Sequence, residues 1–388
     1  MPGEPTALAR RPDTYVWDPR RLEPGHEVEL LVGGPETYAA MLDAIRSAQH
    51  SVLAEVYILR GDDVGRVFAD ALIERARAGV ACFLLYDAIG SIGLDPLLLA
   101  DMTHGGCHVA AYRPLGRFLR RFAVRPLTRR NHRKLLVVDG AVAFVGGINF
   151  GEEYTTSADG AAGWHDVNVR VAGRVAHALA LSFRTMWGRA RGLPAPPEPP
   201  PPSSPGSTFV APLENRDRGN RMAIRRAYLH AIAVAEREIL IQNAYFIPDI
   251  GLRWALRRAC RRGVSIKVIV PSSSDVPMVQ WASRHLYGKL LDMGVRLFAW
   301  RGGMMHAKAA VIDQAWVTVG SYNLDDRSLF HNLELNVVVA DASFGASTHT
   351  RLAADLDRCD ELTLAGWVQR PAWARLLEWI VYRFKRWL

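Results

Sequence analysis

The chain has 388 residues, of which 49% are hydrophobic and 22% charged. This is a globular composition that excludes a largely disordered chain and is long enough for two domains. A formal net charge of +9 indicates an anionic partner, but it does not separate nucleic acid from a membrane surface or a phosphorylated substrate. The sequence has no run of about 18 apolar residues, which is the length of a membrane-spanning helix.

The predicted elements follow the same order twice. A helix and then a strand are expected in residues 37–59, and again in 67–87, where helical periodicity gives way to short β-rich runs. After the proline-rich stretch 193–206, which is typical of an extended spacer, the order repeats in 221–247 and 252–271. We therefore predict an internal duplication: two similar α/β domains, each a mixed, mostly parallel sheet flanked by helices.

A six-position pattern follows the predicted elements in each half and contains the candidate catalytic residues. Every offset from the histidine is the same in both copies, which span residues 132–149 and 306–323. The copies are His132, Lys134, Asp139, Gly146, Gly147 and Asn149, and His306, Lys308, Asp313, Gly320, Ser321 and Asn323.

Successive side chains of a strand point to opposite faces of the sheet, which divides the motif residues into two groups. Alternation places each histidine and its lysine on one face and the aspartate on the other. Asp139 is followed by Gly140, a hairpin-turn dipeptide, so we expect a structural role for Asp139 and, by analogy, for Asp313. The small residues Gly147 and Ser321, with Asn149 and Asn323, are expected to approach a bound anion.

Two copies of this pattern meeting at one phosphodiester would supply complementary catalytic groups. One histidine attacks phosphorus to form a phosphohistidine, and the other protonates the leaving alcohol and later deprotonates the incoming one. The lysines and asparagines would stabilise the charge on the phosphoryl oxygens. The sequence does not decide which histidine attacks, although His132 is favoured. No metal or cofactor is expected.

The doubled HxKxxxxD pattern with trailing GGxN and GSxN resembles the phospholipase D superfamily. Segments such as "QNAYFIPD" and "HAKAAVIDQAWVTVGSYNLDDRS" are similar to bacterial cardiolipin synthases, most of all to the form without amino-terminal membrane-spanning helices. The resemblance implies a pair of α/β domains with the active site at their interface, and it includes Asp139 and Asp313 in the catalytic motif. It also implies an acidic residue behind each histidine: Glu334 after His306, and Asp166 after His132 if an insertion is allowed.

Two further segments favour a lipid surface. Residues 113–134 carry nine arginines or lysines and no acidic residue, interleaved with apolar side chains. At the C-terminus a helical stripe is expected to dock on the membrane surface or on its own domain, with basic residues near the headgroups. The stripe is Trp373, Leu376, Leu377, Ile380, Phe384 and Trp387, and the basic residues are Arg375, Arg383, Lys385 and Arg386.

These patterns together predict a cardiolipin synthase-type phosphatidyltransferase bound peripherally to the cytoplasmic face of the membrane. Its substrates would be phosphatidylglycerol and, as a possible donor, phosphatidylethanolamine, with no nucleic acid partner. The expected regions are a first domain at 1–192, a linker at 193–206, a second domain at 207–370 and a surface helix at 371–388. A phospholipid hydrolase, a nuclease and a non-catalytic lipid-binding scaffold are the alternatives, the last disfavoured because both motifs are intact.

Overall fold

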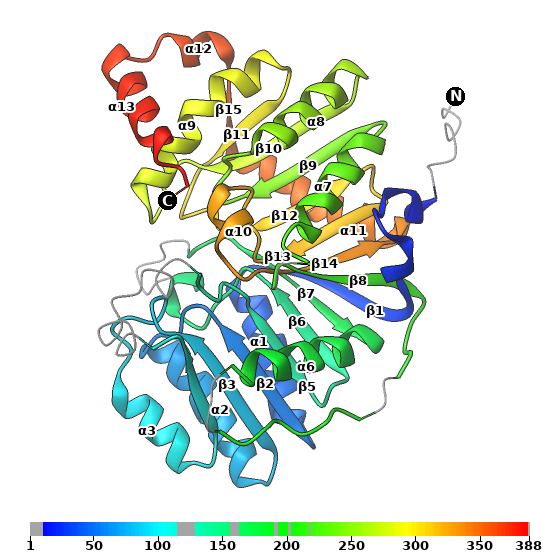
Figure 1. The fold of residues 1–388 in the computed structure, drawn as a ribbon, viewed down its shortest axis with the longest axis vertical. Coiled ribbons are helices and arrows are strands. Elements are labelled where there is room, and N and C mark those ends of the chain that lie inside the picture. The colour runs from blue at the N-terminus through cyan, green and yellow to red at the C-terminus, as the bar shows by residue number, and fades with distance from the viewer. Residues whose placement is uncertain are drawn as a thin grey trace.

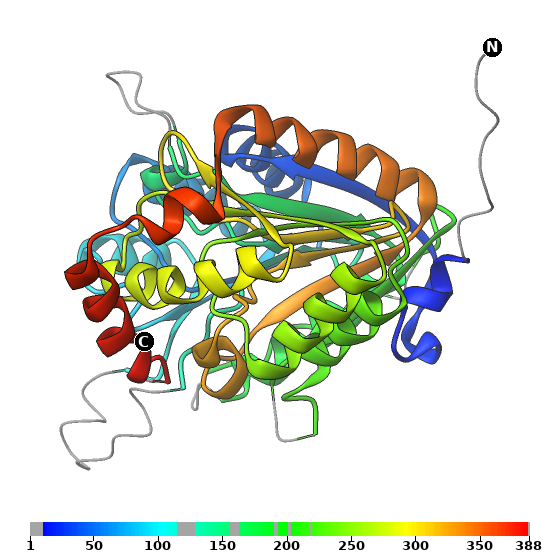
Figure 2. The ribbon, with the colours of Figure 1, turned by 90° about the horizontal axis from the view of Figure 1, so that it is seen from above.

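The structure is a computed structural model that describes residues 11–114, 129–155, 163–189, 193–200, 203–216 and 219–386. Its described residues form one fifteen-stranded sheet with helices on both sides (Figures 1 and 2). The strand order is β15-β11-β10-β9-β12-β13-β14-β8-β1-β7-β6-β5-β2-β3-β4. Read outward from the central β8–β1 pair, the two halves have equivalent orders, which confirms the predicted duplication.

The first half has a helix or strand where the sequence predicts one. Its strands are β1 (Glu23–Val32), β2 (Ser51–Val56), β3 (Ala81–Asp87), β4 (His108–Tyr112), β5 (Leu135–Val138), β6 (Val142–Gly146) and β7 (Val167–Ala172). Its helices are α1 (Gly34–Ser47), α2 (Asp63–Arg77), α3 (Pro96–His104) and α6 (Arg174–Trp187).

The second half repeats this order and adds elements at its end. Its strands are β8 (Thr208–Glu214), β9 (Glu238–Asn243), β10 (Ser265–Pro271), β11 (Arg296–Trp300), β12 (Lys308–Ile312), β13 (Trp316–Gly320), β14 (Leu335–Ala340) and β15 (Cys359–Leu362). Its helices are α7 (Ala223–Val234), α8 (Ile250–Arg261), α9 (Pro277–Asp292), α10 (Asp326–Phe330), α11 (Ala342–Ala353), α12 (Leu364–Val368) and α13 (Ala372–Arg383).

The mixed α/β class is confirmed, but the pairing is more antiparallel than expected. Among the strands that the structure describes, only β2, β3 and β4, and their equivalents β9, β10 and β11, are parallel neighbours. The difference arises at the motif, where β5 and β6 form a hairpin and β7 returns antiparallel to β6. The second half repeats this arrangement in β12, β13 and β14.

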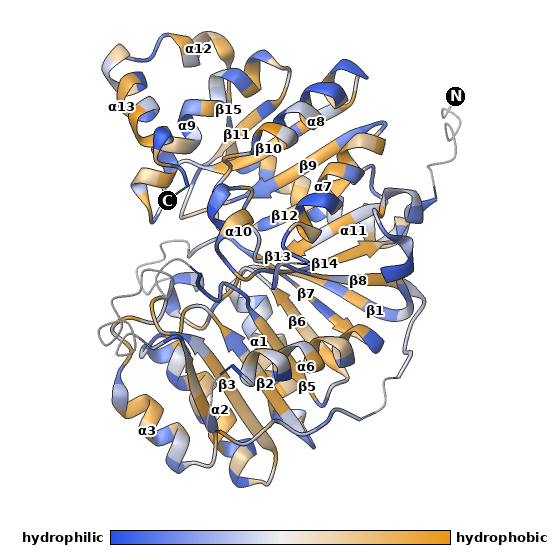
Figure 3. Ribbon diagram, in the orientation of Figure 1, coloured by the Kyte–Doolittle hydropathy of each residue, from blue (hydrophilic) through white to orange (hydrophobic). Residues whose placement is uncertain are grey.

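The hydrophobic core joins the halves. One buried cluster takes residues from the strands of both halves and from α6 and α11, and β6 and β7 pack against β13 and β14. Two other clusters lie under α1 to α3 and under α7 to α9. The strands are accordingly the most apolar elements in Figure 3. This shared core fixes the position of one motif relative to the other.

Candidate active site

Each candidate histidine contacts a carboxylate from the opposite half of the chain. His132 Nδ1 lies 3.0 Å from Glu334 Oε2, and His306 Nδ1 lies 2.6 Å from Asp166 Oδ2. The sequence placed each acidic residue after the histidine of its own repeat, whereas the structure exchanges them. Both carboxylates are fully buried. Neither half therefore contains a complete histidine–carboxylate pair.

Backbone pairing produces this exchange. The segment before β5 forms an isolated bridge between Asn131 and Leu333, and the His132 N–H donates to the Leu333 carbonyl at 3.0 Å. On the other side, the His306 N–H donates to the His165 carbonyl at 2.7 Å. Each histidine is thus held by backbone of the half that supplies its carboxylate.

The contacts at Nδ1 leave Nε2 of each ring to face a substrate. A neutral imidazole that donates its Nδ1 proton to a carboxylate carries its lone pair on Nε2. Burial lowers the pKa of His132 against the opposing effect of Glu334. Burial, and then the charge of Lys308, lowers the pKa of His306 well below the usual value. The rings are therefore nucleophilic when no substrate is bound.

The pKa values of the two carboxylates shift in opposite directions. Burial raises the pKa of Asp166 to about 6. Burial acts in the same direction on Glu334, but His132 and Lys134 outweigh it and hold the pKa of Glu334 below its usual value.

Both lysines lie inside the site. Lys134 Nζ donates to the His132 carbonyl at 2.8 Å, and Lys308 Nζ donates to the His306 carbonyl and lies 3.9 Å from Asp166. Burial, and then the charge of Lys308, lowers the pKa of Lys134, while burial lowers that of Lys308 to about 8. Because the charge of Lys308 disfavours the charged form of Lys134, an anion bound near both ammonium groups would stabilise them.

Comparison with known proteins identifies the family of this chain. The model of the family described as "Cardiolipin synthase, PLD-like domain" matches residues 41–187 and 228–358. The chain belongs to this family. Among its relatives, the major cardiolipin synthase of Bacillus subtilis is 32% identical over 91% of this chain and 73% of its own length. Cardiolipin synthase B of Escherichia coli K12 is 34% identical over 93% of this chain and 88% of its own length.

A solved structure has the same fold. It is the phosphatidylserine synthase of Haemophilus influenzae Rd KW20, with a TM-score of 0.71 and 13% identity over 93% of this chain and 95% of that one. The predictions of a phospholipase D-like family and of a duplicated α/β fold are therefore confirmed. Within the described residues, no helix has the length and apolarity needed to cross a bilayer.

Gly147 and Ser321, which the sequence assigned to substrate, support the two carboxylates of this phospholipase D-like site. A Cβ at Gly147 would lie 2.2 Å from Asp166 Oδ2, so the glycine makes room for that carboxylate. The Ser321 hydroxyl donates to Glu334 and accepts the Leu335 N–H at 3.0 Å. Contact of Gly147 and Ser321 with phosphate stays a prediction, and the structure adds a role for both beneath the acidic residues.

The asparagines differ between the halves. Asn149 Oδ1 accepts the Ile58 N–H at 2.9 Å and its Nδ2 donates to the Tyr154 hydroxyl at 2.8 Å, so Asn149 ties two loops together. The Asn323 side chain is buried and its Oδ1 has no hydrogen-bond partner. Contact of either amide with phosphate stays a prediction.

The two motif aspartates do not belong to the catalytic group, which corrects the grouping that the resemblance implied. Asp139 has a φ of 53° at the β5–β6 turn and accepts the N–H groups of 49–51 at 2.7–2.9 Å. Asp313 has a φ of 51°, accepts the N–H groups of 236–238, and accepts the Tyr15 hydroxyl at 2.8 Å. Each aspartate fixes its hairpin to the loop before β2 or β9.

Aromatic side chains surround both histidines. Tyr57 packs edge-on against His132 with ring centroids 4.9 Å apart, and its ring lies 5.1 Å from Lys134 Nζ. Trp164 lies 5.0 Å from His306, and the Tyr154 hydroxyl lies 3.4 Å from His306 Nδ1. Tyr57 directly follows β2. The sequence analysis missed Tyr154 and Trp164, which flank the expected insertion.

The basic run before His132 is only partly available to a membrane, which corrects its interpretation. Arg130 forms a buried ion pair with Asp87 at 2.7 Å, and Arg133 is buried between Glu55 and Glu214 at 3.4 and 3.5 Å. These arginines neutralise carboxylates from distant parts of the chain. Residues 115–128, which contain four further arginines of the run, lie outside the described residues.

Helix α13 lies on its own half and still presents an apolar face. It packs on α9, with Leu377 and Val381 turned toward the core and Glu378 paired with Arg284 and Arg370. The outward face carries Trp373, Leu376, Trp379, Ile380 and Phe384. Two details of the expected stripe change: Leu377 faces inward, and Lys385 pairs with Asp326 at 3.0 Å. Trp387 lies outside the described residues.

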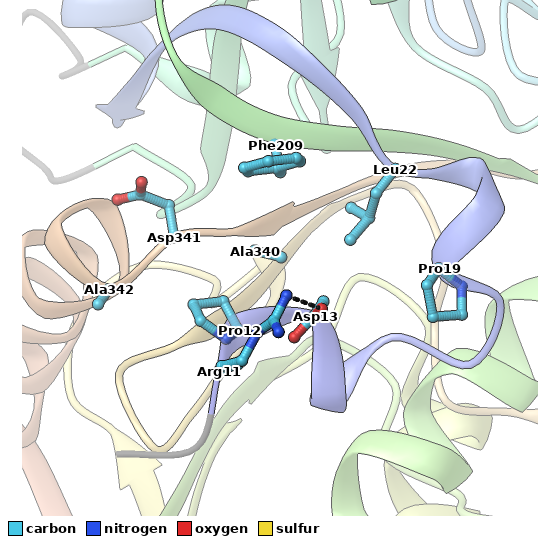
Figure 4. Close-up of a pocket in the computed structure, with 9 residues that line it drawn as sticks. All are labelled: Arg11, Pro12, Asp13, Pro19, Leu22, Phe209, Ala340, Asp341 and Ala342. Carbon is cyan, nitrogen blue, oxygen red and sulfur yellow. Dashed lines mark hydrogen bonds and ion pairs between the residues drawn. The ribbon is translucent and has the colours of Figure 1, made fainter. Parts of the chain in front are cut away.

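A separate cavity of about 370 Å³ lies between the first residues of the described chain and the central strands (Figure 4). Its polar groups already have partners: Asp13 pairs with Arg11 at 3.0 Å, and Asp341 accepts the Phe344 N–H at 2.7 Å. None of the candidate catalytic residues lines this cavity.

Proposed function

We propose that this protein transfers a phosphatidyl group from one glycerophospholipid to the primary hydroxyl of phosphatidylglycerol, giving cardiolipin and a small alcohol. The observation that carries the proposal is the exchanged pair of histidine–carboxylate contacts, which leaves two Nε2 atoms free for one phosphodiester. The relatives named cardiolipin synthase supply the product.

The reaction proceeds in two displacements. In the first, Nε2 of one neutral histidine attacks phosphorus and the bond from phosphorus to the leaving alcohol breaks. The other histidine, which takes up a proton on Nε2 when the anionic phosphodiester binds, gives that proton to the leaving oxygen. In the second, this histidine removes the proton from the incoming hydroxyl, whose oxygen attacks phosphorus and breaks the phosphorus–nitrogen bond. Lys134 and Lys308 offset the charge that develops on the phosphoryl oxygens.

His132 remains the favoured nucleophile, and the other ring would be the acid and base. The carboxylates Glu334 and Asp166 orient the rings and stabilise each imidazolium as it forms. A reaction with phosphorus-labelled lipid, quenched by denaturant at alkaline pH because acid hydrolyses the phosphorus–nitrogen bond, tests the assignment. His306→Ala should retain a labelled phosphohistidine without turnover, whereas label retained by His132→Ala would reverse the assignment.

A membrane surface would bind at the outward face of α13. Three aromatic side chains lie on this face, Trp373, Trp379 and Phe384, and Trp373 is 70% exposed. Tryptophan with neighbouring arginines is typical of the interface between headgroups and acyl chains. The net charge of +9 suits the anionic leaflet that faces the cytoplasm, so we place the protein peripherally on that face.

The activity is tested with purified protein and vesicles of phosphatidylglycerol, with and without phosphatidylethanolamine, with products identified by mass spectrometry. Cardiolipin is expected. His132→Ala and His306→Ala should each abolish turnover, whereas His104→Ala, an exposed position on α3, should not. Phosphatidic acid as the sole product would instead indicate a phospholipase D, and cleavage of single-stranded DNA with lipids untouched would indicate a nuclease.

Membrane binding is tested by cosedimentation with anionic vesicles. Trp373→Ser should weaken binding, and Trp254→Ser, which removes an exposed tryptophan from α8, is the matched control. Equal binding by both variants would contradict the assignment of this face.

A further inference from the structure

A cluster of basic side chains lies beside the catalytic pair and takes no part in the mechanism described above. It consists of Arg129, Arg221, Arg327 and His331, and we call it the arginine cluster. Arg129 precedes His132 by three residues, Arg221 lies just before α7, and Arg327 and His331 lie in and directly after α10. Figure 1 places α10 between the two halves, beside the C-terminus.

These side chains are close enough to act on one another's charge. The pKa of Arg129 is lowered by burial and then by the positive charges of Arg221 and Arg113. The pKa of His331 is lowered by burial and then by Arg327, Arg221 and Arg129. The cluster therefore concentrates positive charge from three separate segments at one place.

Arg129 differs from the two buried arginines that follow it. Arg130 and Arg133 each form an ion pair with a carboxylate, whereas no carboxylate among the described residues pairs with Arg129. The enclosed Nε of Arg129, like that of Arg133, has no hydrogen-bond partner. An unpartnered donor among like charges raises the free energy of the empty site and lowers the cost of binding an anion there.

The nearby acidic side chains of α10 are occupied. Asp326 pairs with Lys385, and Asp325 accepts the Ser328 N–H at the start of the helix. Burial raises the pKa of Asp325 to about 7, which reduces its negative charge near neutral pH. The charge of Arg327 lowers the pKa of Asp325 against the effect of burial, so Asp325 acts on the Arg327 end of the cluster.

The backbone register places part of the cluster close to the His132–Glu334 contact. The bridge between Asn131 and Leu333 sets two segments side by side, with the His132–Glu334 contact at one end. Arg129 and His331 lie three residues earlier on the same two segments, a span of at most about 10 Å. The arginine side chains can cover part of this distance.

The chemistry of the proposed reaction requires a second anion near the first. The reacting phosphate sits between the histidines, and the leaving glycerol or ethanolamine carries no further phosphate. An acceptor phosphatidylglycerol brings its own phosphodiester, separated from the attacking hydroxyl by one glycerol unit. Water, the competing acceptor, brings none.

Resting on the proposed function, we infer that the arginine cluster binds the phosphodiester of the acceptor lipid and thereby favours transfer over hydrolysis. Guanidinium groups suit this role because they donate paired hydrogen bonds to phosphate oxygens. The cluster holds the acceptor while its hydroxyl faces the phosphohistidine.

The test measures how much of the phosphatidyl-enzyme reacts with phosphatidylglycerol and how much reacts with water. Arg129→Gln and Arg221→Gln are incubated with phosphatidylglycerol vesicles, and cardiolipin and phosphatidic acid are both quantified. Each variant should lower the ratio of cardiolipin to phosphatidic acid by about tenfold, the effect of losing about one charge-assisted hydrogen bond. Arg258→Gln, which removes an exposed charge from α8, should keep the wild-type ratio. An unchanged ratio in both cluster variants, or a parallel fall of both products, would overturn the inference.

Failure of the proposed function gives a different result. If the wild type makes only phosphatidic acid, cardiolipin synthesis is excluded, and the cluster is tested by the inhibition of hydrolysis by glycerol 3-phosphate. Inhibition about tenfold weaker in Arg129→Gln than in Arg258→Gln would support an anion site. Equal inhibition of the two variants would exclude one.

Discussion

Gly147→Ala should inactivate the enzyme because the added methyl group displaces the Asp166 carboxylate. The substitution adds no polar group, so the effect would be steric. The new Cβ would lie 2.2 and 2.3 Å from the two carboxylate oxygens, although real Cβ atoms essentially never approach another atom within 3.0 Å. The carboxylate must therefore move by about 1 Å from the position in which it contacts His306, and a displacement of that size can cost about 100-fold in rate. This loss corresponds to about 2.7 kcal/mol of transition-state stabilisation.

The assay is the rate of phosphatidylglycerol consumption per folded molecule, with folding checked by circular dichroism and thermal unfolding. Gly188→Ala is the matched control, because its Cβ would lie 3.5 Å from the nearest atom, the Arg184 carbonyl oxygen. It should keep wild-type activity. If Gly147→Ala folds and keeps activity within about threefold of the wild type, the contact between Asp166 and His306 is dispensable and the reasoning is refuted.

Three other predictions concern the motif aspartates, the buried arginines and pH. Asp139→Asn should lower the free energy of unfolding by about 1–3 kcal/mol, measured by urea denaturation, while the folded fraction keeps most of its activity. Arg133→Met should cost about 3–5 kcal/mol in the same measurement, because it leaves Glu55 buried beside an apolar side chain; a neutral effect would restore the surface interpretation of this arginine. Activity as kcat/KM should fall above about pH 8, as Lys308 loses the proton that makes it cationic, and below about pH 6, as Asp166 gains one. A flat profile from pH 5 to 9 would contradict both assignments.

The duplicated motif could be predicted from the sequence because both repeats keep the same offsets from the histidine. The hairpin at Asp139 was also predictable, since Asp-Gly tolerates a positive φ and the flanking runs are β-rich. Helix and strand order followed from local periodicity. These features depend on residues close in sequence, which is where pattern analysis succeeds.

The exchange of carboxylates could not be predicted from the sequence, because it depends on contacts between residues far apart in the chain. His132 and Glu334 are separated by 202 positions, and no local pattern distinguishes this pairing from the one within a repeat. Arg130 and Arg133 looked like surface cations for the same reason: Asp87, Glu55 and Glu214 come from other segments. The role of Gly147 beneath Asp166 could not be predicted either, because the two residues are neighbours only in three dimensions.

The exchange of carboxylates between the two halves affects how such a protein can evolve. A single half expressed by itself carries a histidine without its carboxylate, so it gains a complete centre only by associating with another half. Joining the two in one chain replaces that encounter by a high local concentration, since the linker keeps the halves together. It also frees the centres to diverge, and here one pairs Gly147 with the shorter aspartate while the other pairs Ser321 with the longer glutamate.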